Sequence, residues 1–223
     1  MAYTAYYRLN GDCNDAMGAY HLINTGTATF VQGKFNDCVS LNGSSQYLSI
    51  ADNLGVGTSA FTMSCWVNLA AYAGAGLASV FLQLNDETGD TECWIELVTA
   101  AGPVYQIASV RRRMSGTYEY QLVTLPWSLN TWYNAVLVYD SSRIKSYVNG
   151  KLYGDAASSG NGSSSSPNKF IIGEYWTGGA PAAGYYTNGK IDEVIVEARA
   201  WTAAEIKNYY NFSMGLYAPK MRW

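Results

Sequence analysis

The clearest alternation of apolar and polar residues lies in the middle of the chain. From 132 to 139, apolar side chains would point to both sides of an extended chain, which predicts a central strand covered on both faces. A second alternating segment covers 144–148. Asn149-Gly150 then favours a type I′ turn, because both central residues of that turn need positive φ. A returning strand begins at Leu152, so this region predicts a three-stranded antiparallel β-meander.

The rest of the chain repeats this two-residue alternation in short segments separated by turn-forming residues. Strands are predicted at residues 3–9, 27–31, 38–41, 47–50, 60–69, 79–84, 93–98, 105–112, 119–125, 170–174 and 191–197. Thr202 and Glu205 have the spacing of a capping box and predict one helix over 203–211. No repeat or linker divides the chain, so we expect one domain over 1–214 and a tail over 215–223.

These elements predict an all-β fold, an antiparallel two-sheet β-sandwich with one short C-terminal helix. Its core should form where the inner faces of the two sheets pack together. The residues expected there are Phe61, Met63, Val136, Val138, Val148, Ile172, Val194 and Val196.

Four segments, taken in order, resemble the laminin-G-like branch of the concanavalin A-like lectin/glucanase superfamily. They are residues 39–50, 61–67, 132–152, which contains the sequence YVNGKL, and 188–206, which contains GKIDEV. They extend over most of the chain, and the resemblance implies a jelly roll of two curved sheets.

Composition narrows the possible partners. The chain has 223 residues, 48% of them hydrophobic, with 19 Tyr, 7 Trp and a formal net charge of −3. This charge gives no reason to expect nucleic acid as a partner. No apolar run approaches the roughly 20 residues that span a bilayer, so membrane insertion is not expected. The four cysteines form no CxxC pair, and we expect free thiols.

The resemblance implies action outside cells, yet the first residues lack the charged and apolar regions of a signal peptide. Either the chain is a module cut from a larger protein, or it reaches an extracellular or virion-surface location without a classical signal peptide, which is the location we expect. Assembly into a particle in the cytoplasm and release by lysis is one such route.

The resemblance also implies a structural calcium site. Its ligands would be Asp192 and a carbonyl from Asn42 or Gly43, with Asp12 and Asp15 as further candidates if the first loop folds over. The alternative is that Asp192 only caps a turn or accepts a hydrogen bond from a backbone amide.

Aromatic and amide side chains in the loops indicate a carbohydrate-binding surface, because sugars stack on rings and bond to polar groups. The candidate ligand-binding residues are Tyr72, Trp94, Trp176, Tyr185 and Tyr186, with Asn85 and Asp86 beside them. The alternative is that these rings pack the sandwich, as buried aromatics usually do.

Catalysis is not expected. Glucanases on this scaffold set acidic residues two apart on one strand, whereas Glu92 and Glu96 are four apart, or roughly 13 Å along a strand. The run Arg111-Arg112-Arg113 is typical of an exposed edge strand kept soluble by charge.

The sequence therefore predicts a non-catalytic recognition or adhesion module on a virus or phage particle, whose partner is a glycan or host-surface receptor. One alternative is a structural decoration or assembly protein that contacts neighbouring particle subunits, with homo-oligomer formation through the tail. A glycoside hydrolase or lyase is the second alternative.

Overall fold

The computed structural model describes residues 3–56, 59–85, 92–99, 105–114, 117–158, 168–177 and 179–215, without the side chains of Glu92 and residues 105–122. The strands are β1 (Ala5–Tyr7), β2 (Ile23–Thr25), β3 (Thr29–Gln32), β4 (Asp37–Asn42), β5 (Tyr47–Ile50), β6 (Phe61–Leu69), β7 (Ala78–Asn85), β8 (Glu92–Thr99), β9 (Tyr105–Met114), β10 (Thr117–Thr124), β11 (Tyr133–Tyr139), β12 (Arg143–Val148), β13 (Lys151–Ala157), β14 (Lys169–Ile172), β15 (Trp176–Thr177), β16 (Ala180–Pro181) and β17 (Asn188–Glu197). Within the described residues the only helix is α1 (Ala203–Ser213).

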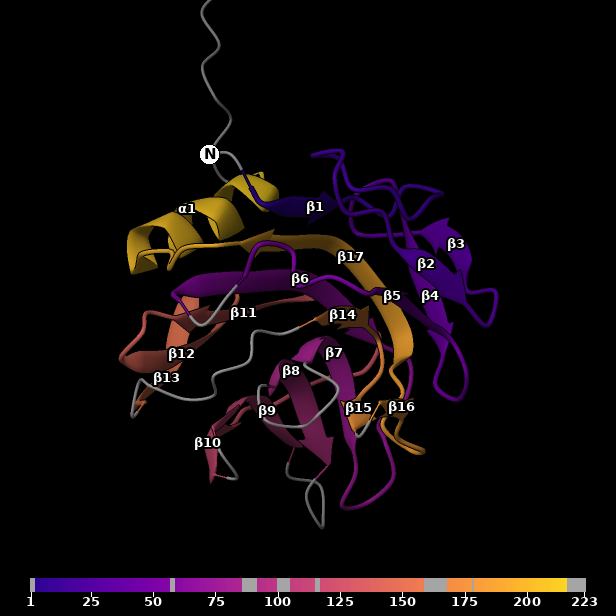
Figure 1. The fold of residues 1–223 in the computed structure, drawn as a ribbon. Coiled ribbons are helices and arrows are strands. Elements are labelled where there is room, and N and C mark those ends of the chain that lie inside the picture. Colours follow the sequence, from indigo (N-terminus) through magenta and orange to yellow (C-terminus); the bar gives the residue numbers. More distant parts are fainter. Residues whose placement is uncertain are drawn as a thin grey trace, which may run out of the picture.

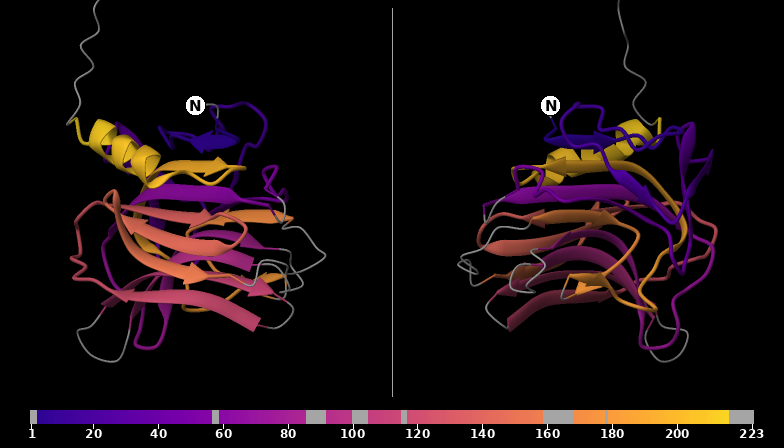
Figure 2. Two further views of the ribbon diagram at one scale, coloured as in Figure 1. Left: turned by 90° about the vertical axis from the view of Figure 1, so that its left-hand side faces the viewer. Right: turned by 45° about the vertical axis from the view of Figure 1, so that its right-hand side comes forward.

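Two antiparallel sheets form the sandwich, which confirms the predicted fold class (Figure 1). Sheet A has the order β13-β12-β11-β6-β17-β4-β3, with β1 also paired to β17, and sheet B has the order β10-β9-β8-β7-β14-β5-β2. Figure 2 shows these layers from two further sides, with α1 lying against sheet A. The short hairpin of β15 and β16 is separate from both sheets.

In each sheet a strand from late in the chain lies in the centre. In sheet A, β17 lies between β6 and β4, and in sheet B, β14 lies between β7 and β5. These two strands join the N-terminal strands to those from the middle of the chain.

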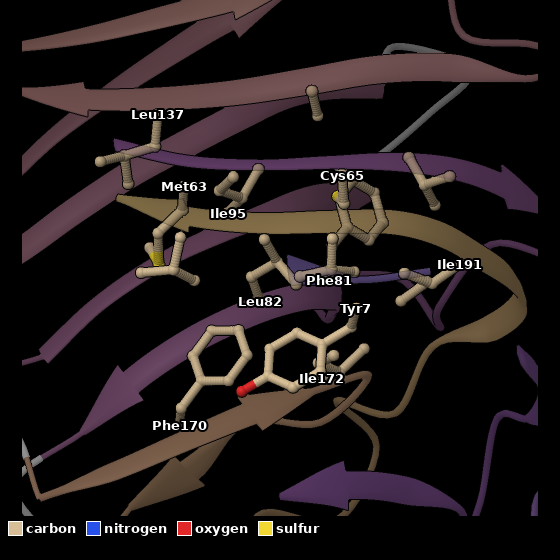
Figure 3. Packing of buried hydrophobic residues seen from close by; sticks show 14 of the residues in the cluster. Tyr7, Met63, Cys65, Phe81, Leu82, Ile95, Leu137, Phe170, Ile172 and Ile191 are labelled. Carbon is tan, nitrogen blue, oxygen red and sulfur yellow. The ribbon is translucent and has the colours of Figure 1, made fainter. Parts of the chain in front are cut away.

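The space between the sheets holds the main hydrophobic core, in which Met63, Phe81, Ile95 and Phe170 meet from both sides (Figure 3). Six of the eight predicted core residues are in it: Phe61, Met63, Val148, Ile172, Val194 and Val196. Cys65 is buried there as well, and all four cysteines are free, as predicted.

The prediction was wrong for Val136 and Val138, which lie on the opposite face of sheet A. They join a second cluster with Ile195, Trp201 and Ile206, beneath α1. On β11 it is the alternate residues, including Ala135 and Leu137, that face the core between the sheets. The strand is apolar on both faces because a helix covers the outer one.

The predicted meander and helix are both present. Asn149 and Gly150 have φ values of 50° and 75°, as a type I′ turn requires. At α1, Thr202 and Glu205 form the predicted capping box. A Cβ at Gly150 would lie 3.0 Å from the Cβ of Tyr210, so the helix packs directly on the turn of the meander.

The structure corrects one further prediction and adds the short strands β2, β15 and β16. The arginine run lies in β9, which pairs with both β8 and β10 and is therefore internal to sheet B. The short strand β2 at the edge of sheet B was not predicted. Among the described residues, no helix is long and apolar enough to cross a membrane.

Candidate functional site

The outer face of sheet B, turned away from sheet A, carries polar and aromatic side chains. On β8, Cys93, Ile95 and Leu97 point into the core between the sheets. Since side chains alternate along a strand, Trp94 and Glu96 lie on the outer face. Both are nonetheless almost fully buried, because a loop covers this face.

The covering loop, residues 173–187, includes the hairpin of β15 and β16 and lies beside β7 (Figure 1). The Gln83 amide donates to the Trp176 carbonyl at 2.9 Å and accepts from the Trp176 N–H at 2.7 Å. Asn85 donates to the same carbonyl at 2.7 Å. Near the end of the loop, the Thr187 hydroxyl donates to the Val80 carbonyl at 2.6 Å. The loop is therefore fixed on β7 by buried polar groups.

Between the loop and β8 lies a pocket of about 120 Å³, which we call the β8 pocket. It is lined by Trp94, Glu96, Tyr175 and Tyr185. The Tyr175 ring centroid lies 5.1 Å from that of Trp94 and 5.6 Å from that of Tyr185. Three rings with a carboxylate among them can stack on a sugar and hydrogen-bond its hydroxyl groups.

Glu174, next to Tyr175, is fully buried under the same loop. Neither of its carboxylate oxygens has a partner at hydrogen-bond distance and angle among the described residues, although the N–H groups of Tyr175 and Ala182 and the Tyr186 hydroxyl are near. Burial raises the pKa of Glu174 to about 8. Burial and the neighbouring Glu174 charge likewise raise the pKa of Tyr186. Ionising a carboxyl group in such surroundings costs stability, and a pKa perturbed in this way makes the loop a candidate functional site.

Of the predicted sugar-binding residues, the structure brings Trp94 and Tyr185 together in one pocket. Trp176 is half-buried and does not line this pocket; the Lys169 ammonium lies 3.6 Å from its ring centroid and Tyr47 packs against it edge-on. Asn85 is buried and fixes the loop.

The other predicted residues do not line the β8 pocket. Tyr72 packs against the core between the sheets, and its hydroxyl donates to the Trp127 carbonyl at 2.6 Å. Tyr186 is half-buried beside Glu174. Asp86 lies outside the described residues.

Three functional residues were not predicted: Tyr175, Gln83 and Glu174. Gln83 did leave a signal, since it is a polar residue inside an otherwise apolar strand, and a buried amide needs partners. Tyr175 directly precedes Trp176 in the same aromatic loop, but nothing in the sequence shows which of the two rings faces outward.

The predicted calcium ligands are not brought together. Asn42 pairs with Asn188, four residues along β17 from Asp192, or roughly 13 Å away. Gly43 follows Asn42 in the turn after β4. One oxygen of Asp192 accepts the N–H groups of Lys34 and Phe35, both at 2.9 Å, which is the predicted alternative. Burial raises the pKa of Asp192 to about 7, and its Oδ1 has no hydrogen-bond partner in the described structure.

Asp15 and Asp12 organise the first loop. The buried Asp15 carboxylate accepts four backbone N–H groups, from Tyr6, Met17, Ala19 and Tyr20. Asp12 is exposed and accepts from the Asn14 N–H.

No group of three His, Cys, Asp or Glu residues that could hold a metal occurs in the described parts of the chain. These residues do not assemble the six to eight oxygens that calcium prefers.

Comparison with known proteins decides the family. The model of the concanavalin A-like lectin/glucanases superfamily matches residues 42–207. The chain belongs to this superfamily. No curated protein matches the sequence.

Solved structures share the fold of this superfamily member at low sequence identity. Domain 4 of AbnA, a GH43 extracellular arabinanase from Geobacillus stearothermophilus, solved in complex with arabinotriose, is 20% identical with a TM-score of 0.74. That match covers 92% of this chain and 97% of the other. The binding domain of botulinum neurotoxin serotype G is 13% identical with a TM-score of 0.70, covering 95% of this chain and 51% of the other. The binding domain of Paraclostridial Mosquitocidal Protein 1 is 16% identical with a TM-score of 0.70, covering 89% and 49%.

The superfamily contains both lectins and glucanases, and the number of carboxylates in the β8 pocket can be compared with what a glucanase needs. Retaining glucanases need two carboxylates about 5 Å apart. Glu96 is the one carboxylate among the residues that line this pocket, and the side chain of Glu92 lies outside the described residues.

Proposed function

We propose that this superfamily member is a non-catalytic carbohydrate-binding module whose sugar site is the β8 pocket. The observation that carries the proposal is the placement of Glu96 among the rings of Trp94, Tyr175 and Tyr185. The half-buried rings of Tyr175 and Tyr185 offer faces for stacking, and the carboxylate accepts hydrogen bonds from sugar hydroxyls. The loop that forms one wall is fixed on β7, so the site needs little ordering when a sugar binds.

The similar structures support this proposal. The arabinanase domain is matched over almost its whole length and was solved with arabinotriose. The toxin domains are described as binding domains, and one of them, from botulinum neurotoxin DC, was solved in complex with SialylT. These are properties of those proteins, and they make arabinotriose and sialylated glycans reasonable first probes.

A glycan-array assay followed by titration of the best ligand tests the proposal. We expect saturable binding that Tyr185→Ala weakens about 3- to 10-fold through lost ring contact. We expect Glu96→Gln to weaken it about 10-fold through loss of a charged acceptor. Tyr153→Ala, at an exposed tyrosine of β13, is the matched control and should leave binding unchanged.

Two outcomes would overturn this proposal. Equal losses with Tyr185→Ala and Tyr153→Ala would place the sugar elsewhere. Absence of saturable binding would favour the structural decoration or assembly protein, and the solution size of the full chain and of a chain lacking residues 215–223 would then be compared.

Calcium and the virion or extracellular setting remain predictions from the sequence. The array assay is therefore run with calcium and again with a chelator. Binding lost only with the chelator would support a cation at the free oxygen of Asp192. Binding unaffected by the chelator would leave the sugar site independent of metal.

A further inference from the structure

A second pocket, of about 270 Å³, lies on the other side of the sandwich, where β1, β17 and the end of α1 meet. We call it the α1 pocket. Its lining includes five aromatic rings and one carboxylate. The rings are those of Tyr3, Tyr6, Phe35, Tyr209 and Phe212, and the carboxylate is that of Glu193. Apart from Phe35, these residues come from the two ends of the sequence and are brought together because β1 pairs with β17.

The backbone places Glu193 in an unusual conformation. The register of β17 against β6 shifts between Asp192 and Ile195, and Glu193 at this bulge has φ 49°. A non-glycine residue in the left-handed region costs energy and often marks a functional site. The bulge turns the Glu193 side chain to the pocket, where the Tyr6 hydroxyl donates to its carboxylate.

Tyr209 contributes a hydroxyl group that lacks a hydrogen-bond partner. Its hydroxyl is buried and has no hydrogen-bond partner among the described residues. Burial and the nearby Glu193 charge raise the pKa of Tyr209 well above its ordinary value, so it stays a neutral donor. A ligand hydroxyl in the pocket would supply the missing partner.

The electrostatics of this lining are negative. The faces of aromatic rings attract cations, and the Glu193 carboxylate adds a charge in largely apolar surroundings. Two of the rings already attract cations: Arg8 lies 5.4 Å from the Tyr6 centroid and Lys34 lies 5.9 Å from that of Phe35. Neither cation is among the residues that line the pocket.

We propose that the α1 pocket binds a quaternary ammonium group, and choline is the simplest ligand of this class. Its trimethylammonium head offers methyl groups to the rings and a positive charge to Glu193. Its hydroxyl is a possible partner for Tyr209. The α1 pocket shares no lining residue with the β8 pocket, so this proposal can be tested independently of the proposed sugar site.

The test compares choline with its uncharged carbon isostere, dimethylbutanol, on the full chain by calorimetry or NMR titration. We expect choline to saturate at millimolar concentration and the isostere to bind at least about 10-fold more weakly, because only choline carries charge. Glu193→Gln should remove most of this difference.

Phe212 gives the matched pair of variants. It is 64% exposed, so Phe212→Ala should leave the fold intact while weakening choline binding about 3- to 10-fold. Met214→Ala, at an exposed residue outside the pocket lining, should leave choline binding unchanged. Arg8→Gln should tighten binding slightly, because it removes a competing charge near Glu193.

Three results would each overturn the proposal. These are choline binding that does not saturate by about 100 mM, equal affinity for the isostere, and equal effects of the Phe212 and Met214 variants.

Discussion

The two outer faces of the sandwich are covered in different ways. On sheet A, Ile206 of α1 packs in a cluster that includes Val136 and Val138. On sheet B, the covering segment is the irregular loop 173–187. A helix satisfies its own backbone and can pack closely on an apolar strand face. A loop must take partners from the sheet, here the side chains of Gln83 and Asn85.

The buried carboxylates follow the same division. Beneath the helix, Glu197 accepts from the Trp201 indole N–H and, at 2.6 Å, from the Arg199 guanidinium. Beneath the loop, both oxygens of Glu174 lack a hydrogen-bond partner among the described residues. The helix-covered face is thus arranged for stability. The loop-covered face keeps a pocket and a buried carboxyl group whose ionisation is unfavourable, as functional sites often do.

The largest expected effect comes from removing the polar groups that hold each covering element. Gln83→Leu leaves the Trp176 N–H without its acceptor. Thr62→Val removes the hydroxyl that donates to the Arg199 carbonyl at 2.8 Å and accepts from the Trp201 N–H at 2.9 Å. Each should lower the free energy of unfolding in urea by about 2 kcal/mol.

Only Gln83→Leu should also lower sugar affinity, because only it releases the wall of the β8 pocket. Sugar titration of the two variants, under conditions where both remain folded, makes the comparison. Equal losses of affinity would mean that the loop is not held by Gln83.

Next in size is the effect of pH through Glu174. The folded protein keeps this carboxyl protonated up to a pH of about 8, whereas an ordinary glutamate releases its proton near 4.5. Between these values the folded state binds more protons, so stability falls as pH rises. Glu174→Gln removes this term, and the melting temperature at pH 8 should rise by about 2–4 °C for each kcal/mol recovered. At pH 4.5 the two proteins should melt alike.

Glu197→Gln is the counterpart on the other face and should have the opposite sign. It weakens an acceptor that holds Trp201 and Arg199, so the melting temperature should fall at pH 8. A rise in both variants would contradict the difference between the two faces.

The smallest effect is expected at Arg199, whose side chain is 40% exposed while it pairs with Glu197 and Glu205 at 2.6 and 2.9 Å. Arg199→Gln should cost less than about 1 kcal/mol, because exposed ion pairs are screened. The Arg199 guanidinium holds the pKa of Glu205 down to about 2, so this stability is present above pH 4.5 and is lost as pH falls to 2. Thermal melts at low and high salt measure it, and a loss that persists in high salt would contradict this account.

Local sequence rules predicted the parts of the fold that depend on neighbouring residues. The Asn149-Gly150 turn and the Thr202–Glu205 capping box are both where their residue types require them. The inner and outer faces of β11 could not be told apart, because both are apolar and alternation alone does not say which one a helix covers. The place of β9 in sheet B depends on pairing with β8 and β10, which no local pattern encodes.

The candidate site was also predicted only in part, because its side-chain contacts depend on the folded structure. Trp94 and Tyr185 were predicted as ligand residues, and they lie in one pocket. Tyr72 and Trp176 are aromatic loop residues as well, but the Tyr72 hydroxyl donates to the Trp127 carbonyl and the Lys169 ammonium lies against the Trp176 ring. No local sequence pattern encodes either contact. Asn85 looked like a sugar-binding amide and instead holds the loop.

The central positions of β14 and β17 have a consequence for how the chain is made. Until residues 169–197 have been synthesised, β7 and β5 lack their shared partner in sheet B, and β6 and β4 lack theirs in sheet A. The nascent chain therefore carries four open strand edges, which are templates for pairing with other chains. Because neither sheet is complete without these strands, we expect folding to follow their synthesis. We expect the insertion of these late strands to be the slow step, because contacts distant in sequence form slowly.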